Sequence, residues 1–130
     1  MANATVLKKT RVAWGTLGAL DTAGGVISWQ NNEGQTIIIT RVVIYTTTKA
    51  TGACTIDVGT TATNGTTSSN NLLTGLDVGT AAGVFDNINE AGASGKARQT
   101  LANGKWVTGS MASGAAAGLV GNFYIEYILV

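Results

Sequence analysis

The sequence has no histidine, no proline and a single cysteine, Cys54. Without histidine the chain can form neither a Ser-His-Asp triad nor a histidine metal site, and it lacks the usual general base near neutral pH. One cysteine excludes a disulfide within the chain, so we expect Cys54 to be a small buried hydrophobe. These absences argue against an enzyme, and we expect no cofactor and no metal.

Charge is also scarce. Only 12% of residues are charged and the formal net charge is +1, whereas about 25% is usual. A nucleic-acid surface needs clustered Lys and Arg, because its affinity comes from counterion release. The one dense basic cluster is Lys8, Lys9 and Arg11, and no run of apolar residues reaches the length of a membrane span. We therefore expect neither nucleic acid nor a membrane as a partner.

What the sequence does contain is typical of β-strands. Thr, Val, Ile and Tyr fill the periodic segments, and Gly, Asn and Ser fill the gaps between them. With 18 glycines and no proline, glycine has to make the turns. The pattern predicts one all-β domain over residues 11–130, a β-sandwich with jelly-roll or Greek-key wiring and about 7–9 strands. An extended N-terminal arm is expected over residues 1–10.

The strongest strand signals lie in the middle and at the end of the chain. Gln35 to Thr48 is dense in β-branched residues and apolar on both faces, which predicts a central strand covered on both sides for part of its length. Asn122 to Val130 alternates with a period of two. Further strands are expected at 6–14, 26–30, 53–60, 83–88, 99–101 and 105–111. Five residues are expected in the core because they alternate with polar neighbours: Ile56, Val58, Phe123, Ile125 and Tyr127.

Residues 61–74 are predicted to form a loop that Leu72 and Leu73 pin to the core, and residues 111–118 a loop or an uneven strand. The string IDVGT at 56–60 recurs as LDVGT at 76–80, which we interpret as two similar strand-to-turn exits. Asp57 and Asp77 in these strings could hold Ca²⁺ through oxygen ligands. The favoured interpretation is that each caps a turn of its own backbone.

Part of the sequence resembles a known class of virion proteins. Residues 39–87 read ITRVVIYTTTKATGACTIDVGTTATNGTTSSNNLLTGLDVGTAAGVFDN, and the chain closes on the alternating strand NFYIEYILV. The combination of a hydrophobic strand, TIDVGT, a polar loop, NLLTGLDVGT and a small-residue run resembles the jelly-roll cement, or decoration, proteins of tailed-bacteriophage capsids. The resemblance covers roughly Ile39 to Val130, and no binding residue carries over individually.

The resemblance implies a non-enzymatic protein that binds the outer surface of a phage capsid and bridges subunits of the major capsid protein. Its expected location is the capsid exterior of the virion, after synthesis in the host cytoplasm. The large apolar fraction leaves surface to cover, so we also expect self-association, with a homotrimer favoured and a dimer as the alternative.

The N-terminal arm is the expected partner-binding segment. Extended, ten residues reach roughly 33–36 Å, far enough to add a strand to a neighbouring subunit or to lie on the shell. Val6 and Leu7 would fill shallow pockets, while basic side chains would meet acidic charges. The expected partner-binding residues are Val6, Leu7, Lys8, Lys9 and Arg11.

Two other functions remain open from the sequence. A phage tail or fibre domain would share the fold and differ only in its place in the virion. A carbohydrate-binding module would use Trp14, Trp29 and Trp106 as a stacking platform for sugars. We favour core packing or an oligomer interface as the role of these tryptophans.

Overall fold

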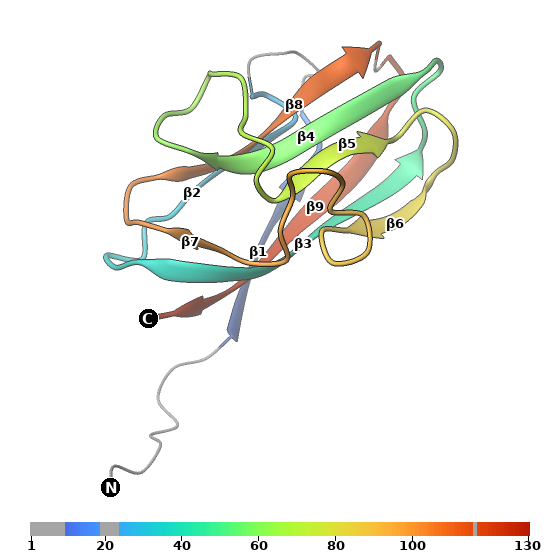
Figure 1. The fold of residues 1–130 in the computed structure, drawn as a ribbon. Coiled ribbons are helices and arrows are strands. Elements are labelled where there is room, and N and C mark those ends of the chain that lie inside the picture. The colour runs from blue at the N-terminus through green and yellow to red at the C-terminus, as the bar shows by residue number, and fades with distance from the viewer. Residues whose placement is uncertain (1–9, 19–23, 116) are drawn as a thin grey trace, which may run out of the picture.

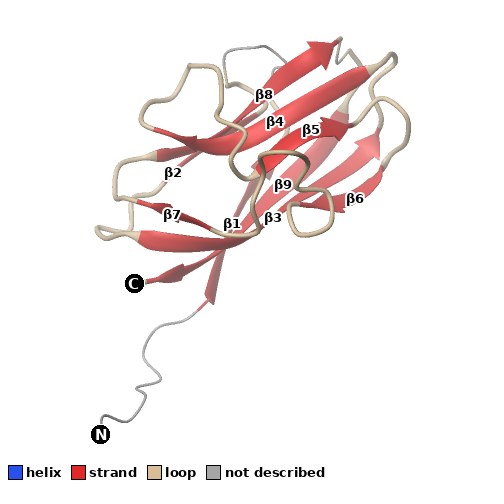
Figure 2. Cartoon of the chain, in the orientation of Figure 1, coloured by secondary structure: helices blue, strands red, loops and turns tan. Residues whose placement is uncertain are grey.

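A computed structural model describes residues 10–18, 24–115 and 117–130. In these ranges the chain forms strands and no helix, and the strands make two facing sheets (Figures 1 and 2). The predicted all-β sandwich is therefore confirmed. The strands are β1 (Thr10–Thr16), β2 (Ile27–Gln30), β3 (Ile37–Thr48), β4 (Cys54–Thr61), β5 (Leu73–Asp77), β6 (Gly83–Asp86), β7 (Gln99–Leu101), β8 (Trp106–Gly114) and β9 (Val120–Leu129).

The strand order is that of a jelly roll. One sheet has the order β1-β9-β3-β6, with the short β7 also paired to β3, and the other has the order β2-β8-β4-β5. The first strand pairs with the last, the second with the last but one, the third with β6 and the fourth with β5, as in a long hairpin rolled into a barrel-like sandwich. All strand pairings are antiparallel.

The core lies between the sheets and follows the predicted alternation. All five residues predicted to be buried are at most 5% exposed, Cys54 is 2% exposed, and Leu72 and Leu73 are fully buried. On β9, Phe123, Ile125 and Tyr127 point inward while the residues between them point outward. The face predicted for this strand is therefore confirmed.

Several predicted boundaries are wrong. β5 begins at Leu73, inside the predicted loop, and β8 continues to Gly114. The short β5 contains Gly75 at φ +65°, so its composition resembles that of a turn. Thr10, assigned to the arm, is the first residue of β1, and the expected strand residues 6–9 lie outside the described residues.

The position of the repeated string in the fold also differs from the one predicted, in which both copies were strand-to-turn exits. Its first copy lies inside β4 and is not a strand exit, whereas the second spans the end of β5. Ile56 in the first copy lies opposite Leu76 in the second. The two copies are thus neighbours in one sheet, where each places an apolar side chain in the core.

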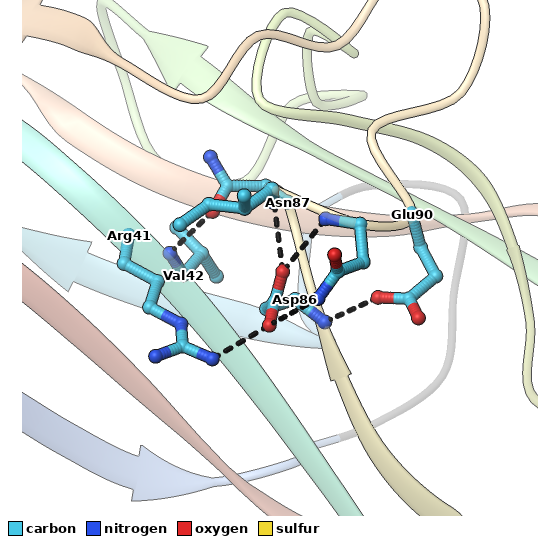
Figure 3. A network of polar contacts seen from close by, with 7 residues as sticks. Arg41, Val42, Asp86, Asn87 and Glu90 are labelled. Carbon is cyan, nitrogen blue, oxygen red and sulfur yellow. Dashed lines mark hydrogen bonds and ion pairs between the residues drawn. The ribbon is translucent and has the colours of Figure 1, made fainter.

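A buried polar network fixes the end of β6 (Figure 3). The Asp86 carboxylate accepts hydrogen bonds from the Ile88 and Asn89 N–H groups, both at 2.8 Å, and forms an ion pair with Arg41 at 2.6 Å. Asn87 is fully buried, and its side-chain oxygen accepts from the Val42 N–H at 2.7 Å. These bonds tie the turn after β6 to β3 and so hold the edge strand in place.

The same network lowers the pKa of Asp86. Burial opposes ionisation, but hydrogen bonds from the Asn89 N–H, the Arg41 guanidinium and the Ile88 N–H, together with the Arg41 charge, outweigh it. The folded protein therefore binds fewer protons at this carboxyl than the unfolded chain does. The resulting stabilisation is present above the unfolded pKa of about 3.9 and is lost as the pH falls through the folded value.

We expect the free energy of unfolding to fall as the pH drops below about 4, and to fall less steeply in Asp86→Asn. Denaturant titrations of both proteins between neutral and strongly acidic pH measure the two slopes. Equal slopes would show that Asp86 does not couple protonation to folding.

Replacement of Ile125 by alanine tests the core. Ile125 is fully buried, so Ile125→Ala should lower the free energy of unfolding by about 2–5 kcal/mol. Ile128→Ala on the outer face of the same strand is the matched control and should cost clearly less. Chemical denaturation measures both, and a loss below roughly 0.5 kcal/mol for Ile125→Ala would contradict the assigned core face.

Candidate protein-interaction face

The two outer surfaces of the sandwich differ in chemistry. On the β2-β8-β4-β5 sheet, the outward side chains are mostly polar, with Trp106 as an exception, and the connection over residues 62–72 folds across part of them. The Ser68 N–H donates to the Ser110 hydroxyl at 2.7 Å, and the Ser68 hydroxyl donates to the Asp57 carbonyl at 3.1 Å. Thr108 and Ser110 are consequently 0% and 2% exposed although they lie on an outer face.

Glycine allows this close cover. A Cβ added at Gly59 would lie 2.4 Å from the Ser69 carbonyl oxygen and 2.7 Å from Asn71, closer than real contacts allow. The Asn71 side-chain oxygen in turn accepts from the Thr60 N–H at 2.9 Å. Within the described residues, the chain therefore covers this face of the sandwich with its own backbone.

The outer face of the β1-β9-β3-β6 sheet carries an apolar patch that is uncovered in the part of the chain that the structure describes, and Arg41, Asp86, Asn122 and Glu126 lie on the same side around it. Trp14, Tyr124 and Val43 lie side by side across β1, β9 and β3, and Tyr45 lies opposite Val84 on β6. Residues opposite each other in an antiparallel sheet share a face. We define the apolar face as Val12, Trp14, Val43, Tyr45, Val84 and Tyr124.

Four residues of the apolar face expose large fractions of their surface. Trp14 is 66% exposed, Val84 64%, Val12 57% and Tyr45 41%. With whole-residue areas of roughly 150–250 Å², these fractions correspond to on the order of 500 Å² of exposed apolar surface. A patch of this size is comparable to the largest apolar patch on a typical monomer, which is often functional, and a standard interface buries about 800 Å² per partner.

The burial of the outward side chains of β3 differs in part from the prediction. The strand is central in its sheet, as expected, with β9 on one edge and β6 and β7 on the other. Its outward side chains were predicted to be covered for part of the strand's length, and they are half-buried up to Val43 and exposed from Tyr45 onward. Apolar residues on both faces of a strand indicate either a second covering layer or an interface, and the sequence pattern is the same for both.

Arg11 is the predicted binding residue that falls within the described residues. It alternates with Val12 and so lies on the other side of β1 from the apolar face. Its guanidinium forms an ion pair with Glu33 at 2.5 Å while its side chain stays 51% exposed. Val6, Leu7, Lys8 and Lys9 lie outside the described residues.

Glu33 also accepts a hydrogen bond from the Tyr127 hydroxyl at 2.6 Å. Burial, together with the hydrogen bond and charge of Glu33, raises the pKa of Tyr127 to about 12. The phenol therefore remains a neutral donor near neutral pH. It connects the turn after β2 to β9 and gives Arg11 a fixed ionic partner.

The three tryptophans do not gather into one platform. Trp29 packs against the core with its ring centroid 5.1 Å from that of Tyr127. Trp14 lies on the apolar face, whereas Trp106 shares the outward side of β8 with Thr108 and so lies on the opposite sheet. Core packing therefore accounts for Trp29, whereas Trp14 is exposed on the apolar face.

The two aspartates of the repeated string have separate roles. Asp77 caps its own turn, accepting from the Gly79 N–H at 2.8 Å and the Thr80 hydroxyl at 2.6 Å. The Thr80 hydroxyl and the Gly79 and Thr80 N–H groups lower the pKa of Asp77. Asp57 instead accepts from the Gly75 N–H on the neighbouring strand at 2.7 Å, so the predicted turn cap is right for Asp77 and wrong for Asp57.

The described ranges contain no group of three or more His, Cys, Asp or Glu side chains that could hold a metal ion. Nor do these ranges contain a helix able to cross a membrane.

The geometry defines a jelly-roll sandwich with one covered and one bare outer face. In overall fold it is similar to a chain in the structure described as "Acidic stable capsid structure of Helicobacter pylori bacteriophage KHP30". The TM-score is 0.59 at 13% sequence identity, over 95% of this chain and 94% of the other. No family model and no curated protein sequence matches the chain.

Proposed function

We propose that this chain is a non-enzymatic virion structural protein that binds the outer surface of a phage capsid. It uses the apolar face to bridge subunits of the major capsid protein. The observation that carries the proposal is the bare apolar face around Trp14, 66% exposed, on a rigid sheet. Two further supports are the resemblance of the sequence to capsid cement proteins and the fold likeness to a chain from a phage capsid structure.

The chemistry of the face suits this role. Burying about 500 Å² of apolar surface at roughly 25 cal/mol per Å² gives a gross gain on the order of 12 kcal/mol, before the costs of association. Aromatic side chains such as Trp14 and Tyr45 supply large contact areas while losing little conformational entropy. A protein that reinforces a shell needs this interface energy and no reaction chemistry.

Self-association would strengthen the attachment. A homotrimer, or alternatively a dimer, presents several apolar faces to one shell, so that the second and later contacts form within an already bound complex. Symmetric oligomers are the common state of such chains. The proposed location is the capsid exterior of the virion, reached after synthesis in the host cytoplasm.

A tail or fibre domain would use the same fold and the same face, and it differs only in the particle that binds it. A carbohydrate-binding module is less well supported, because Trp29 is packed against the core and Trp14 and Trp106 lie on opposite sheets. Comparing isolated shells with isolated tails as binding targets separates the first two functions.

Charge placed on the apolar face should weaken attachment to the shell. We expect Trp14→Asp and Val84→Asp each to weaken binding to isolated shells by about 30-fold, which corresponds to roughly 2 kcal/mol. Thr67→Asp adds the same charge on the exposed loop over the other sheet and should bind as the unmodified protein does.

Co-sedimentation with shells that lack the protein measures all three variants, and thermal unfolding checks that each is folded. Equal retention of all variants would exclude the apolar face as the interface. Binding of the unmodified protein to tails and not to shells would favour the tail or fibre function.

A further inference from the structure

In the described fold, β5 of one sheet and β6 of the other are both edge strands at the open edge of the sandwich (Figure 1). A groove lies between these two strands. It is an open groove of about 460 Å³, lined in part by Leu76, Phe85, Asp77 and Glu90. Leu76 is a core residue and only 5% exposed, whereas Phe85 packs against the core and is half-buried. The groove thus combines apolar side chains with two carboxylates.

Both carboxylates are held in place by the fold. Asp77 is oriented by the turn that it caps, and its pKa is lowered. Glu90 accepts a hydrogen bond from the Asp86 N–H at 2.7 Å (Figure 3). The positive charge of Lys49 also helps to lower the pKa of Asp77. The hydrogen bonds of the Lys49 ammonium group go to the carbonyls of Ala50 and Gly79 and not to the Asp77 carboxylate. Such a groove favours an extended segment in which a short apolar pair adjoins two positive charges.

The chain itself contains such a segment. Val6-Leu7-Lys8-Lys9 places an apolar pair directly before two lysines, and it precedes β1, which begins at Thr10. Two lysines match two carboxylates, and the apolar pair matches the half-buried ring of Phe85 and the small exposed part of Leu76. We infer that residues Val6–Lys9 of a second copy of this chain bind in the groove between β5 and β6.

Residues 6–9 are too few to reach the groove of their own copy. Four residues extend over at most about 14 Å. Thr10 lies on β1, three strand positions from β6, which amounts to about 14 Å across the sheet. Along the strands, Thr10 is level with Ile38 through Ile128, whereas Asp86 is level with Val43, a further offset of about 16 Å. The combined separation of about 20 Å exceeds the reach of the segment.

The resulting contact is head-to-tail. The segment of each copy enters the groove of the next, so the assembly closes into a ring when the rotation between copies allows it. A closed ring of three copies would be the homotrimer that we favoured from the sequence. The contact requires no shell, so it can be tested independently of capsid binding.

The test uses two complementary double variants of the full chain. Lys8→Glu with Lys9→Glu reverses the charge of the segment. Asp77→Asn with Glu90→Gln removes the charge of the groove but keeps the oxygens that accept hydrogen bonds from Gly79 and Asp86. Lys96→Glu with Lys105→Glu is the control for the first variant, because it makes the same change in net charge at exposed positions elsewhere.

We expect sedimentation analysis to show self-association of the unmodified protein and of the control, and association at least tenfold weaker in each of the two test variants alone. Mixed in equal amounts, the two test variants should form a dimer, because an intact segment then meets an intact groove once. That dimer cannot grow further, since the remaining segment and groove are both impaired.

Three results would overturn the inference. They are a monomeric unmodified protein across the accessible concentrations, association that is unchanged in both test variants, or the absence of a mixed dimer. Loss of self-association in Trp14→Asp with no effect of the charge variants would assign the contact between copies to the apolar face instead. Shell retention, measured separately, reports on the proposed function and not on this contact.

Discussion

The pairing of β3 with β9 is the contact on which the rest of the structure depends. Its register places Ile125 opposite Val42 on the inner side and Tyr124 opposite Val43 on the outer side. Because side chains alternate with a period of two, a slip by one residue would exchange the two sets. The same register therefore fixes the core and the apolar face, and β1 and β6 extend that face from either edge of the central pair.

The difference between the two outer faces follows from how each sheet satisfies its polar groups. The β2-β8-β4-β5 sheet carries hydroxyl groups that bond to the connection over residues 62–72, so the loop and the sheet satisfy each other. On the outer side of the β1-β9-β3-β6 sheet, Val12, Val43 and Val84 offer the backbone of such a loop no hydrogen-bonding group. A backbone laid across them would leave its own N–H and C=O groups unpaired, whereas an apolar surface of another protein would not.

Local periodicity was enough to predict the class of fold, the last strand and the five core residues, because alternation is visible within one strand. It missed β5, since Gly75 interrupts a short edge strand, and it did not single out the apolar face. That face depends on which strands are neighbours: Trp14 and Tyr124 are far apart in sequence and adjacent only through the β1–β9 pairing. The groove combines residues of β5, β6 and the turn after β6 for the same reason, so no local pattern could indicate it.

Several of the few charged residues have a definite structural role. Arg11–Glu33 and Arg41–Asp86 are internal ion pairs that hold the turn after β2 and the edge strand β6. Asp77 and Glu90 instead border the groove. Val84 and Phe85 are consecutive in β6 and point to opposite sides, so one belongs to the apolar face and the other lines the groove. The two surfaces therefore share an edge strand but no side chain. A shell and a neighbouring copy could bind at the same time, which is what a protein that reinforces a lattice requires.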